Sequence, residues 1–154
     1  MKYKRILVVQ GGTSGERKVS FATGRACFEA LKKLGYKVST FDPKKKPFTF
    51  IDKNKTDIIF NALHGKDGED GIAQSYFEYL RIPYTHSGII SSYNAMNKVI
   101  SKEIFKKNEI KSPKYFVIKK ESYNNNMLFF LIKKKNIKFP IVVKPINEGS
   151  SLGV

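Results

Sequence analysis

Apolar positions in the first part of the chain fall into three short runs separated by stretches with a longer period. The runs at residues 4–10, 37–41 and 57–61 predict buried strands. Between the first two runs, apolar residues recur every three or four positions over 19–34, which predicts a helix ending at Gly35. That period places one set of side chains inward: Val19, Ala22, Ala26, Ala30 and Leu34. A second set faces away: Arg25, Glu29 and Lys32.

The same pattern continues to about residue 84. Residues 42–55, with two prolines, are typical of a surface connection. Residues 71–80 predict a helix and 82–84 a short strand. The inward positions expected on that helix are Ile72, Tyr76 and Tyr79 or Leu80. The order strand, helix, strand, strand, helix, strand predicts an α/β fold: an open sheet layer with mostly parallel pairing.

The pattern changes in the last third of the chain. Helices are predicted over 91–97, after a start at Ser87-Gly88, and over 98–108. Beyond Ser112-Pro113, short strands are predicted at 115–118 and 139–143, with a helix over 122–134 between them. The apolar side of that helix holds Met127, Phe130 and Leu131. These changes predict two domains, 1–95 and 96–154.

Composition places the chain among folded proteins of ordinary size. It has 154 residues, 41% of them hydrophobic, which excludes wholesale disorder. No run approaches the roughly 20 apolar residues that cross a bilayer, and the run after the basic amino terminus is too short for a signal peptide. The single cysteine, Cys27, cannot form an internal disulfide, and its neighbours predict a buried helical position. We therefore expect a cytoplasmic protein without a membrane partner.

The formal net charge of +16 suggests nucleic-acid binding, but its distribution argues against it. Residues 1–90 contribute +7 and residues 91–154 contribute +9, so the charge is spread along the chain. Lysine supplies 25 of the 29 cations, whereas base recognition and bidentate phosphate binding rely on arginine. The composition favours a lysine-rich solvated surface.

Two glycine-rich segments follow predicted strands. Residues 11–17 (Gly-Gly-Thr-Ser-Gly-Glu-Arg) join the first strand to the first helix, where anions or zwitterions bind, and Glu16 there suits a substrate ammonium better than a phosphate. Alternatively, Glu16 is a charged residue of the first helix turn with a structural role only. Residues 64–71 (His-Gly-Lys-Asp-Gly-Glu-Asp-Gly) follow the third strand, at the edge where open α/β sheets bind ligands.

A third segment, residues 144–153, begins with Lys144 as the chain leaves the predicted strand 139–143. Its Gly-Ser-Ser-Leu-Gly sequence offers backbone N–H groups and hydroxyls to a polyphosphate, and Lys144 offers an ammonium group. Lys98 is a further candidate cation. Lys98 is spaced by four from Lys102, and Lys102 by four from Lys106, so the spacing taken alone favours a solvated lysine face.

Together these segments resemble the D-alanine–D-alanine ligase family of ATP-grasp enzymes. The resemblance covers essentially the whole chain and is carried by 11–20, 62–65, 68–71 with Gln74, 83–85, 87–88, 96–98, 143–145 and 148–153. It implies a pre-ATP-grasp sheet layer followed by the beginning of an α+β ATP-grasp domain. It also implies ATP-dependent joining of two D-alanines through an acyl phosphate, for peptidoglycan precursors.

The resemblance implies roles for individual residues. Glu16 would hold the ammonium of the first D-alanine, Ser150 would hydrogen-bond within the substrate and loop network, and both would be catalytic. His64 would orient substrate or a closing loop. The residues that would bind ATP are Lys98, Lys144, Gly149, Ser150, Ser151 and Gly153. The acids of 68–71, Thr85 and Ser87 are interpreted as turn and capping residues rather than ligands.

Family members are roughly twice this length, so the chain is expected to be inactive alone. No acid here matches the family's magnesium motif, and the Mg²⁺ ligands are expected in the carboxy-terminal half. Three alternatives stay open: D-alanine–D-lactate ligation, a non-catalytic nucleic-acid-binding domain, and an amino-acid-binding module using the first layer alone. A homodimer would suit the family.

Overall fold

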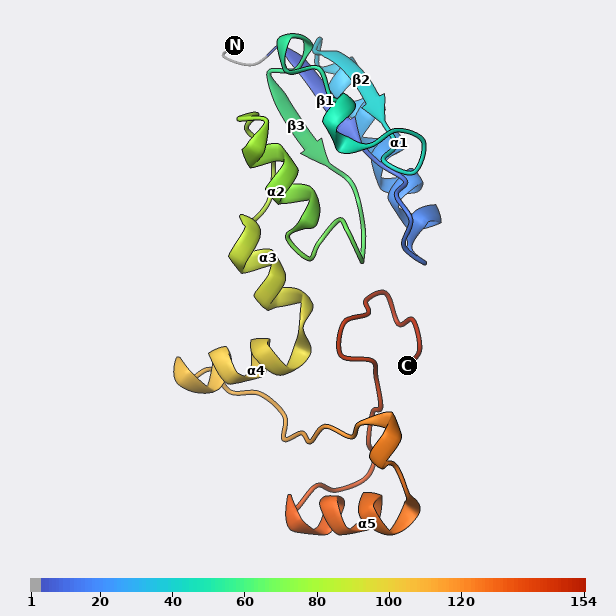
Figure 1. Cartoon of the computed structure of the whole chain (residues 1–154), viewed down its shortest axis with the longest axis vertical. Helices are drawn as coiled ribbons and strands as arrows, with labels where there is room; N and C mark the ends of the chain where they lie inside the picture. The colour runs from blue at the N-terminus through green and yellow to red at the C-terminus, as the bar shows by residue number, and fades with distance from the viewer. Residues whose placement is uncertain (1–3) are drawn as a thin grey trace.

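The computed structural model describes residues 4–154, and its centre is a parallel three-stranded sheet (Figure 1). Strands β1 (Arg5–Val9), β2 (Lys37–Phe41) and β3 (Ile58–Asn61) lie in the order β2-β1-β3, with β1 pairing in parallel with both neighbours. The three strands fall within the predicted ranges. The α/β class and the parallel pairing are therefore confirmed.

The two faces of the sheet bury different sets of side chains. Alternation along β1 sends Leu7 and Val9 to one face and Ile6 and Val8 to the other, and all four are buried. In the register of the sheet, Leu7 lies beside Ile59 of β3. The core on that face consists of Leu7, Val9, Phe48, Ile51, Ile59, Leu63, Ala73, Phe77 and Ile82. Helix α1 covers the opposite face (Figure 1).

Helix α1 (Arg17–Lys33) forms as predicted, and Gly35 follows it with a φ of +85°. The predicted inward face is wrong, because α1 turns Ser20 and Gly24 toward the sheet instead. Gly24 lets the helix approach β1 so closely that a Cβ there would lie 2.0 Å from Gln10 Oε1. The residues predicted to be buried are exposed: Val19, Ala22, Ala26, Ala30 and Leu34. Cys27 is half-buried rather than buried.

Helix α2 (Ile72–Tyr79) also lies within its predicted range but presents a different face to the core. Its buried residues are Ala73, Gln74 and Phe77. Of the predicted inward positions, Leu80, just beyond the helix, packs against the core, and the half-exposed Tyr76 stacks on the core ring of Phe48. Ile72 and Tyr79 are exposed. A rotation of one residue separates the two faces, because Phe77 fills the space above the sheet that the periodicity assigned to Tyr76.

The connection between β2 and β3 is not confined to the surface. It contains two short 3₁₀ helices, η1 (Phe48–Phe50) and η2 (Lys53–Lys55). Phe48 and Ile51 are buried, and the Phe48 ring stacks on Tyr76 at 5.1 Å and meets Phe77 edge-on at 5.8 Å. The prediction of a surface connection over 42–55 is therefore wrong at these two positions.

Beyond α2, the chain returns briefly to the sheet and then leaves it through two helices. Tyr84 forms one parallel bridge with Ile59, so the predicted strand 82–84 is reduced to a single pairing. Helices α3 (Ile89–Met96) and α4 (Lys98–Lys107) follow, close to their predicted ranges. They are separated at Asn97, whose side chain accepts hydrogen bonds from the first backbone N–H groups of α4.

The last third of the chain contains η3 (Lys120–Ser122) and α5 (Asn125–Lys134), and α5 confirms the predicted helix. Phe130, expected on an apolar side, is 61% exposed. Residues 115–118 and 139–143 form no strand within residues 4–154, so the strands predicted there are wrong. None of the helices of residues 4–154 has the length and apolarity that crossing a bilayer requires.

Candidate functional site

The turn at residues 11–16, here called the first turn, joins β1 to α1 through two glycines with positive φ. Gly11 and Gly12 have φ of +88° and +74°, and a Cβ on Gly11 would lie 2.7 Å from Asp42 Oδ1. Asp42, at the end of β2, accepts a 3.1 Å hydrogen bond from the N–H of Gly12 and a bidentate pair from Arg17 at 2.9 and 2.6 Å. Asp42 therefore fixes the path of the first turn.

Electrostatic interactions favour the ionised form of Asp42 and so stabilise its contacts with the first turn. Burial raises the pKa of the Asp42 carboxyl, but hydrogen bonds from Arg17 and from the N–H groups of Gly12 and Lys44 outweigh burial and hold that pKa below its usual value. The hydrogen bond to Asp42 likewise raises the pKa of Arg17. Sequence reasoning assigned no role to Asp42, although a carboxylate directly after a strand, at the sheet edge where ligands bind, was a usable signal.

The turn at residues 64–71, here called the acidic turn, uses its carboxylates to hold its own backbone. Glu69 Oε2 accepts from the N–H of Gly65 at 2.8 Å. Asp70 accepts from the N–H groups of Asp67 at 2.9 Å and of Ile72, in the first turn of α2, at 3.2 Å. These contacts confirm the interpretation of the acids as turn and capping residues. Thr85 also has a structural contact, accepting from the Asn61 N–H at 3.0 Å.

Hydroxyl groups of the first turn bind it to the acidic turn. Thr13 Oγ1 donates to Asp67 Oδ2, and Ser14 Oγ donates to the carbonyl of His64, both at 2.7 Å. The His64 ring lies half-buried, with Nε2 3.0 Å from Thr23 Oγ1 of α1. The two turns thus form one wall, with the His64 imidazole oriented by a hydroxyl of the neighbouring helix.

Glu16 lies where three segments of the chain meet. Its side chain is buried, with an exposed fraction of 3% for the residue, and Oε1 has no hydrogen-bond partner within residues 4–154. Oε2 accepts a hydrogen bond from Ser150 Oγ. Glycines border Oε1 from two sides: a Cβ would lie 2.9 Å from it if added at Gly65 and 3.0 Å if added at Gly149. An unpaired carboxylate oxygen of this kind suits a small cationic group.

The segment 149–153, here called the flap, brings the end of the chain toward the loops that follow β1 and β3 (Figure 1). Besides the Ser150 contact, Leu152 packs over Gly15, where a Cβ would lie 3.2 Å from Leu152 Cδ1. Ser150 and Ser151 have φ of +48° and +59°, and Gly153 has φ of +70°. This left-handed path curls the flap over Glu16.

The two candidate cations have different surroundings. Lys98 begins α4, and its ammonium donates to the carbonyls of Ile146, at 3.3 Å, and Glu148; its backbone N–H also donates to Ile146. Lys98 therefore contacts the base of the flap. Lys144 is exposed, as is Ser151. No contact within residues 4–154 joins Lys144 to Glu16, so the structure does not bring these two together directly.

A cavity of about 250 Å³ lies between the first turn and the acidic turn. It is lined by Gly11, Gly12, Thr13, Pro43, Phe48, Leu63, His64, Lys66, Asp67, Ile72 and Tyr76. His64 is the predicted site residue that reaches it.

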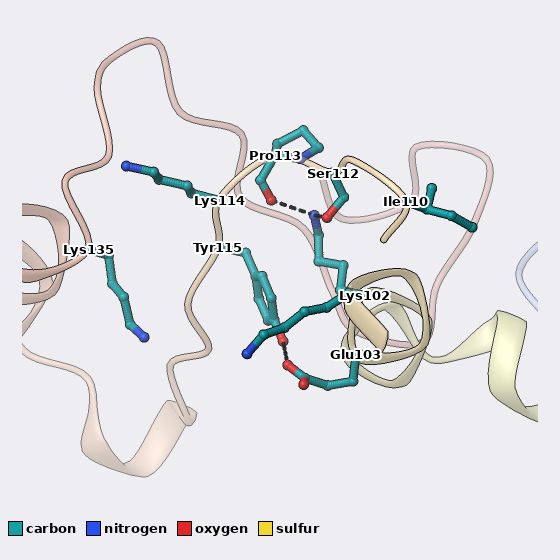
Figure 2. Close-up of a pocket in the computed structure, with 9 residues that line it drawn as sticks. Lys102, Glu103, Ile110, Ser112, Pro113, Lys114, Tyr115 and Lys135 are labelled. Carbon is teal, nitrogen blue, oxygen red and sulfur yellow. Dashed lines mark hydrogen bonds between the residues drawn. The ribbon is translucent and has the colours of Figure 1, made fainter. Parts of the chain in front are cut away.

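A larger pocket of about 400 Å³ lies between α4 and residues 110–115 (Figure 2). Its lysines serve the fold: Lys102 donates to the Pro113 carbonyl at 2.8 Å and lies 5.1 Å from the centre of the Tyr115 ring. The hydroxyl of Tyr115 donates to Glu103 at 2.6 Å, which raises the pKa of Tyr115. This pocket is separate from the three converging segments and holds the chain beyond α4 in place.

The described part of the chain offers no set of side chains that could bind a metal ion together. Within residues 4–154, no group of three or more His, Cys, Asp or Glu side chains is arranged to hold a metal ion. The acids of the acidic turn already accept backbone hydrogen bonds. The arrangement around Glu16 leaves one buried carboxylate oxygen, Oε1, as an acceptor without a partner in residues 4–154.

The chain matches two family models. One, described as the D-ala D-ala ligase N-terminus, matches residues 42–87, and the other, described as the D-ala D-ala ligase C-terminus, matches residues 104–154. Among curated proteins, the D-alanine–D-alanine ligase of Pelagibacter ubique is 51% identical over 98% of the chain and 49% of its own length. D-alanine–D-alanine ligase B of Mesorhizobium japonicum is 44% identical over 100% and 47%. The chain spans about half the length of these relatives.

Solved structures show the same likeness. A D-alanine–D-alanine ligase from Bacillus anthracis superposes with a TM-score of 0.80 at 38% identity, over 97% of this chain and 48% of that structure. The same ligase complexed with ATP gives 0.76 at 36% identity, over 94% and 48%. The fold described above is thus shared with about half of each of these solved chains.

Proposed function

Since the chain belongs to the D-alanine–D-alanine ligase family, we propose that the complete protein containing it joins two D-alanines at the expense of ATP. The proposal extends from this half-length chain to the activity of a whole enzyme. The product would be D-alanyl-D-alanine, for peptidoglycan precursors made in the cytoplasm. A homodimer would be compatible with this function.

The reaction would proceed through two group transfers. A carboxylate oxygen of the first D-alanine attacks the γ-phosphorus of ATP, the bond to the β,γ-bridging oxygen breaks, and ADP leaves. The amine of the second D-alanine then attacks the acyl carbon, the C–N bond forms, the C–O bond to phosphate breaks, and the amine loses a proton. Both transfers depend chiefly on positioning and charge stabilisation.

The observation that carries the proposal is the buried Glu16 carboxylate at the meeting point of the first turn, the acidic turn and the flap. Oε1 has no partner in residues 4–154, and an ammonium group would supply one. Because the Ser150 hydroxyl of the flap donates to Oε2, Oε1 is left for the substrate ammonium. His64, anchored by Thr23, would orient the same substrate or the loop that closes over it.

The ATP side of the proposal rests on the flap and two lysines. The N–H groups of Gly149, Ser150, Ser151 and Gly153 would cradle phosphate oxygens, while the Ser150 hydroxyl donates to Glu16. Lys98 is close to this segment through its contacts with Ile146 and Glu148, and would exchange those carbonyls for phosphate. Lys144, exposed on the strand-like segment that leads into the flap, would bind the same phosphates.

Magnesium, which the family relationship implies, does not fit the described part of the chain, because residues 4–154 offer no suitable ligand cluster. The 154-residue chain by itself is expected to lack turnover, since positioning of the γ-phosphate would be incomplete.

Product analysis tests the activity itself. The complete protein, supplied with ATP and D-alanine, should release phosphate and form the amide-linked dipeptide. Formation of an ester with D-lactate in preference to the amide would favour the alternative D-alanine–D-lactate activity. No phosphate release with either acceptor would contradict the proposal.

Two substitutions then separate the two substrate sites. Glu16→Gln keeps an acceptor for Ser150 but loses the charge, so the KM for the first D-alanine should rise about 10- to 100-fold, as expected for about 1.5–3 kcal/mol. Lys144→Ala should raise the KM for ATP instead. Each variant is the control of the other. If both changed the two KM values equally, or neither changed any, the residue assignments would be wrong.

A further inference from the structure

Gln74 is a polar residue in the core beneath the acidic turn. It lies on α2 between buried Ala73 and exposed Ser75, and is itself 2% exposed. Its Nε2 donates a 2.9 Å hydrogen bond to the carbonyl of Gly68, while its Oε1 has no partner within the described residues. A buried amide oxygen without a partner costs stability, and an apolar side chain of similar size would avoid that cost. Packing alone therefore does not explain a glutamine here.

A second amide converges on the same carbonyl. Asn61, the last residue of β3, donates from Nδ2 to the Gly68 oxygen at 3.0 Å and is also buried. A carbonyl oxygen has two lone pairs, so these two amides satisfy it completely. One comes from the sheet and one from the helix, which fixes Gly68 relative to both.

The fixed carbonyl is linked to Glu16 through a short closed turn. The N–H groups of Gly68 and Glu69 both donate to the carbonyl of Gly65, at 3.1 and 2.9 Å. Gly65, with φ of +68°, is the residue whose Cα faces Glu16 Oε1. Any shift of Gly68 therefore moves the backbone that borders the unpaired oxygen.

We propose that Gln74 is a positioning residue for the first substrate: together with Asn61 it holds the acidic turn at the distance from Glu16 that admits a primary ammonium group. This inference rests on the proposed ligase function. In this proposal Gln74 does not contact the substrate. It sets the position of the acidic turn, which faces the Glu16 carboxylate.

The test is Gln74→Met in the complete enzyme, because methionine has a similar length and no hydrogen-bond donor. The KM for the first D-alanine should rise about 10- to 100-fold, as expected when a supporting change misplaces a binding group. The KM for ATP should stay within about twofold, and the thermal midpoint should stay or rise because the unpaired amide oxygen is removed. A role in stability alone would lower the midpoint and leave the KM ratio unchanged.

Gln10→Met is the matched control. Gln10 also has a buried Oε1 without a partner in residues 4–154, but its side chain lies against Gly24 of α1, not beneath the acidic turn. Both KM values should be unchanged in this variant.

The outcomes separate this inference from the function on which it rests. If the wild-type enzyme is inactive, the proposed ligase function itself is wrong. An active wild type with an unchanged D-alanine KM in Gln74→Met would overturn only the positioning role. Gln74→Leu is the second variant, and failure of both variants to fold would also overturn it, because the proposal requires that stability be retained.

Discussion

Asp42 is the residue that holds the first turn in the conformation that carries Glu16. Its two oxygens accept from Arg17 and from the Gly12 N–H, and Arg17 in turn donates to the Gly12 carbonyl at 2.5 Å. A single carboxylate therefore joins the end of β2 to the start of α1. Glu16 adds no side-chain cap to that helix, which leaves its carboxylate for another partner.

Asp42→Asn should lower the free energy of unfolding by about 1–3 kcal/mol at pH 6, because it removes hydrogen bonds between charged groups. The folded-state pKa of Asp42 is held below its usual value of about 3.9. The stabilisation is therefore complete above about pH 4 and is lost as the pH falls through the folded pKa. Urea unfolding of wild type and variant between pH 6 and pH 3 measures this difference.

Asp52→Asn is the control, since its ion pair with Lys55 is exposed and 3.4 Å long. It should change the free energy of unfolding by less than about 0.5 kcal/mol at any of these pH values. A gap between wild type and Asp42→Asn that did not shrink in acid would contradict the role given to the Asp42–Arg17 pair.

At the scale of elements, helices form where the periodicity predicts them, but their rotation follows tertiary contacts. Helix α1 faces the sheet with Ser20, whose hydroxyl donates to the Ala62 carbonyl at 2.6 Å and accepts from the Gly11 N–H at 2.8 Å. These hydrogen bonds outweigh the burial of an alanine stripe, because each alanine buries little surface. Similarly, η1 is short yet places Phe48 in the centre of the core under α2.

Phe48→Ala should destabilise the chain by about 3–5 kcal/mol, the usual cost of removing a buried ring and leaving a cavity. Phe48 is 7% exposed and stacks with Tyr76, whereas Phe50, two residues along in the same 3₁₀ helix, is 69% exposed. Phe50→Ala should therefore stay within about 0.5 kcal/mol of wild type. Chemical unfolding of both variants compares them directly, and equal losses would show that η1 is not part of the core.

At the scale of the whole molecule, structure is concentrated in the sheet and its covering helices. Residues 115–118 and 139–143 form no strand in the described chain, and Val142 and Val143 are 66% and 76% exposed. The chain spans about half the length of its curated relatives. Within the described residues, the Ser150 hydroxyl of the flap donates to Glu16 and so connects the end of the chain to the first turn.

Hydrogen exchange on the 154-residue chain should reflect this division. Backbone amides of β1 and β3 should exchange slowly, since they lie in a buried ladder. Amides of 115–118 and 139–143 should exchange within the time of the first measurement, because no ladder protects them in residues 4–154. Mass spectrometry of peptides from both regions measures the contrast. Comparable protection in the two regions would contradict it.

Much of the fold and the membership of the site were predictable from local sequence. Strands β1 to β3, the helices and the parallel order follow from periodicity and from glycine stops. Glu16, His64 and Ser150 were identified from their motifs, and the structure places Glu16 against Ser150 and beside the turn that His64 begins. Their roles in binding and catalysis, and the domain division near residue 95, remain predictions.

Asp42, Asn61 and Gln74 could not be given their roles from sequence, because each acts on backbone groups distant along the chain. The predicted buried faces of α1 and α2 were wrong for the same reason. Periodicity shows which residues can share a helix face, whereas hydrogen bonds and ring packing against the sheet determine which face is buried. The strands predicted beyond residue 112 failed for a different reason. Their residues have the propensity to form strands, but no neighbouring strand in the described chain pairs with them. Sequence thus determined the elements and the chemical groups of this protein. Tertiary structure alone decided the orientation of the helices and the unpaired oxygen of Glu16, because both depend on contacts between segments that sequence order does not specify.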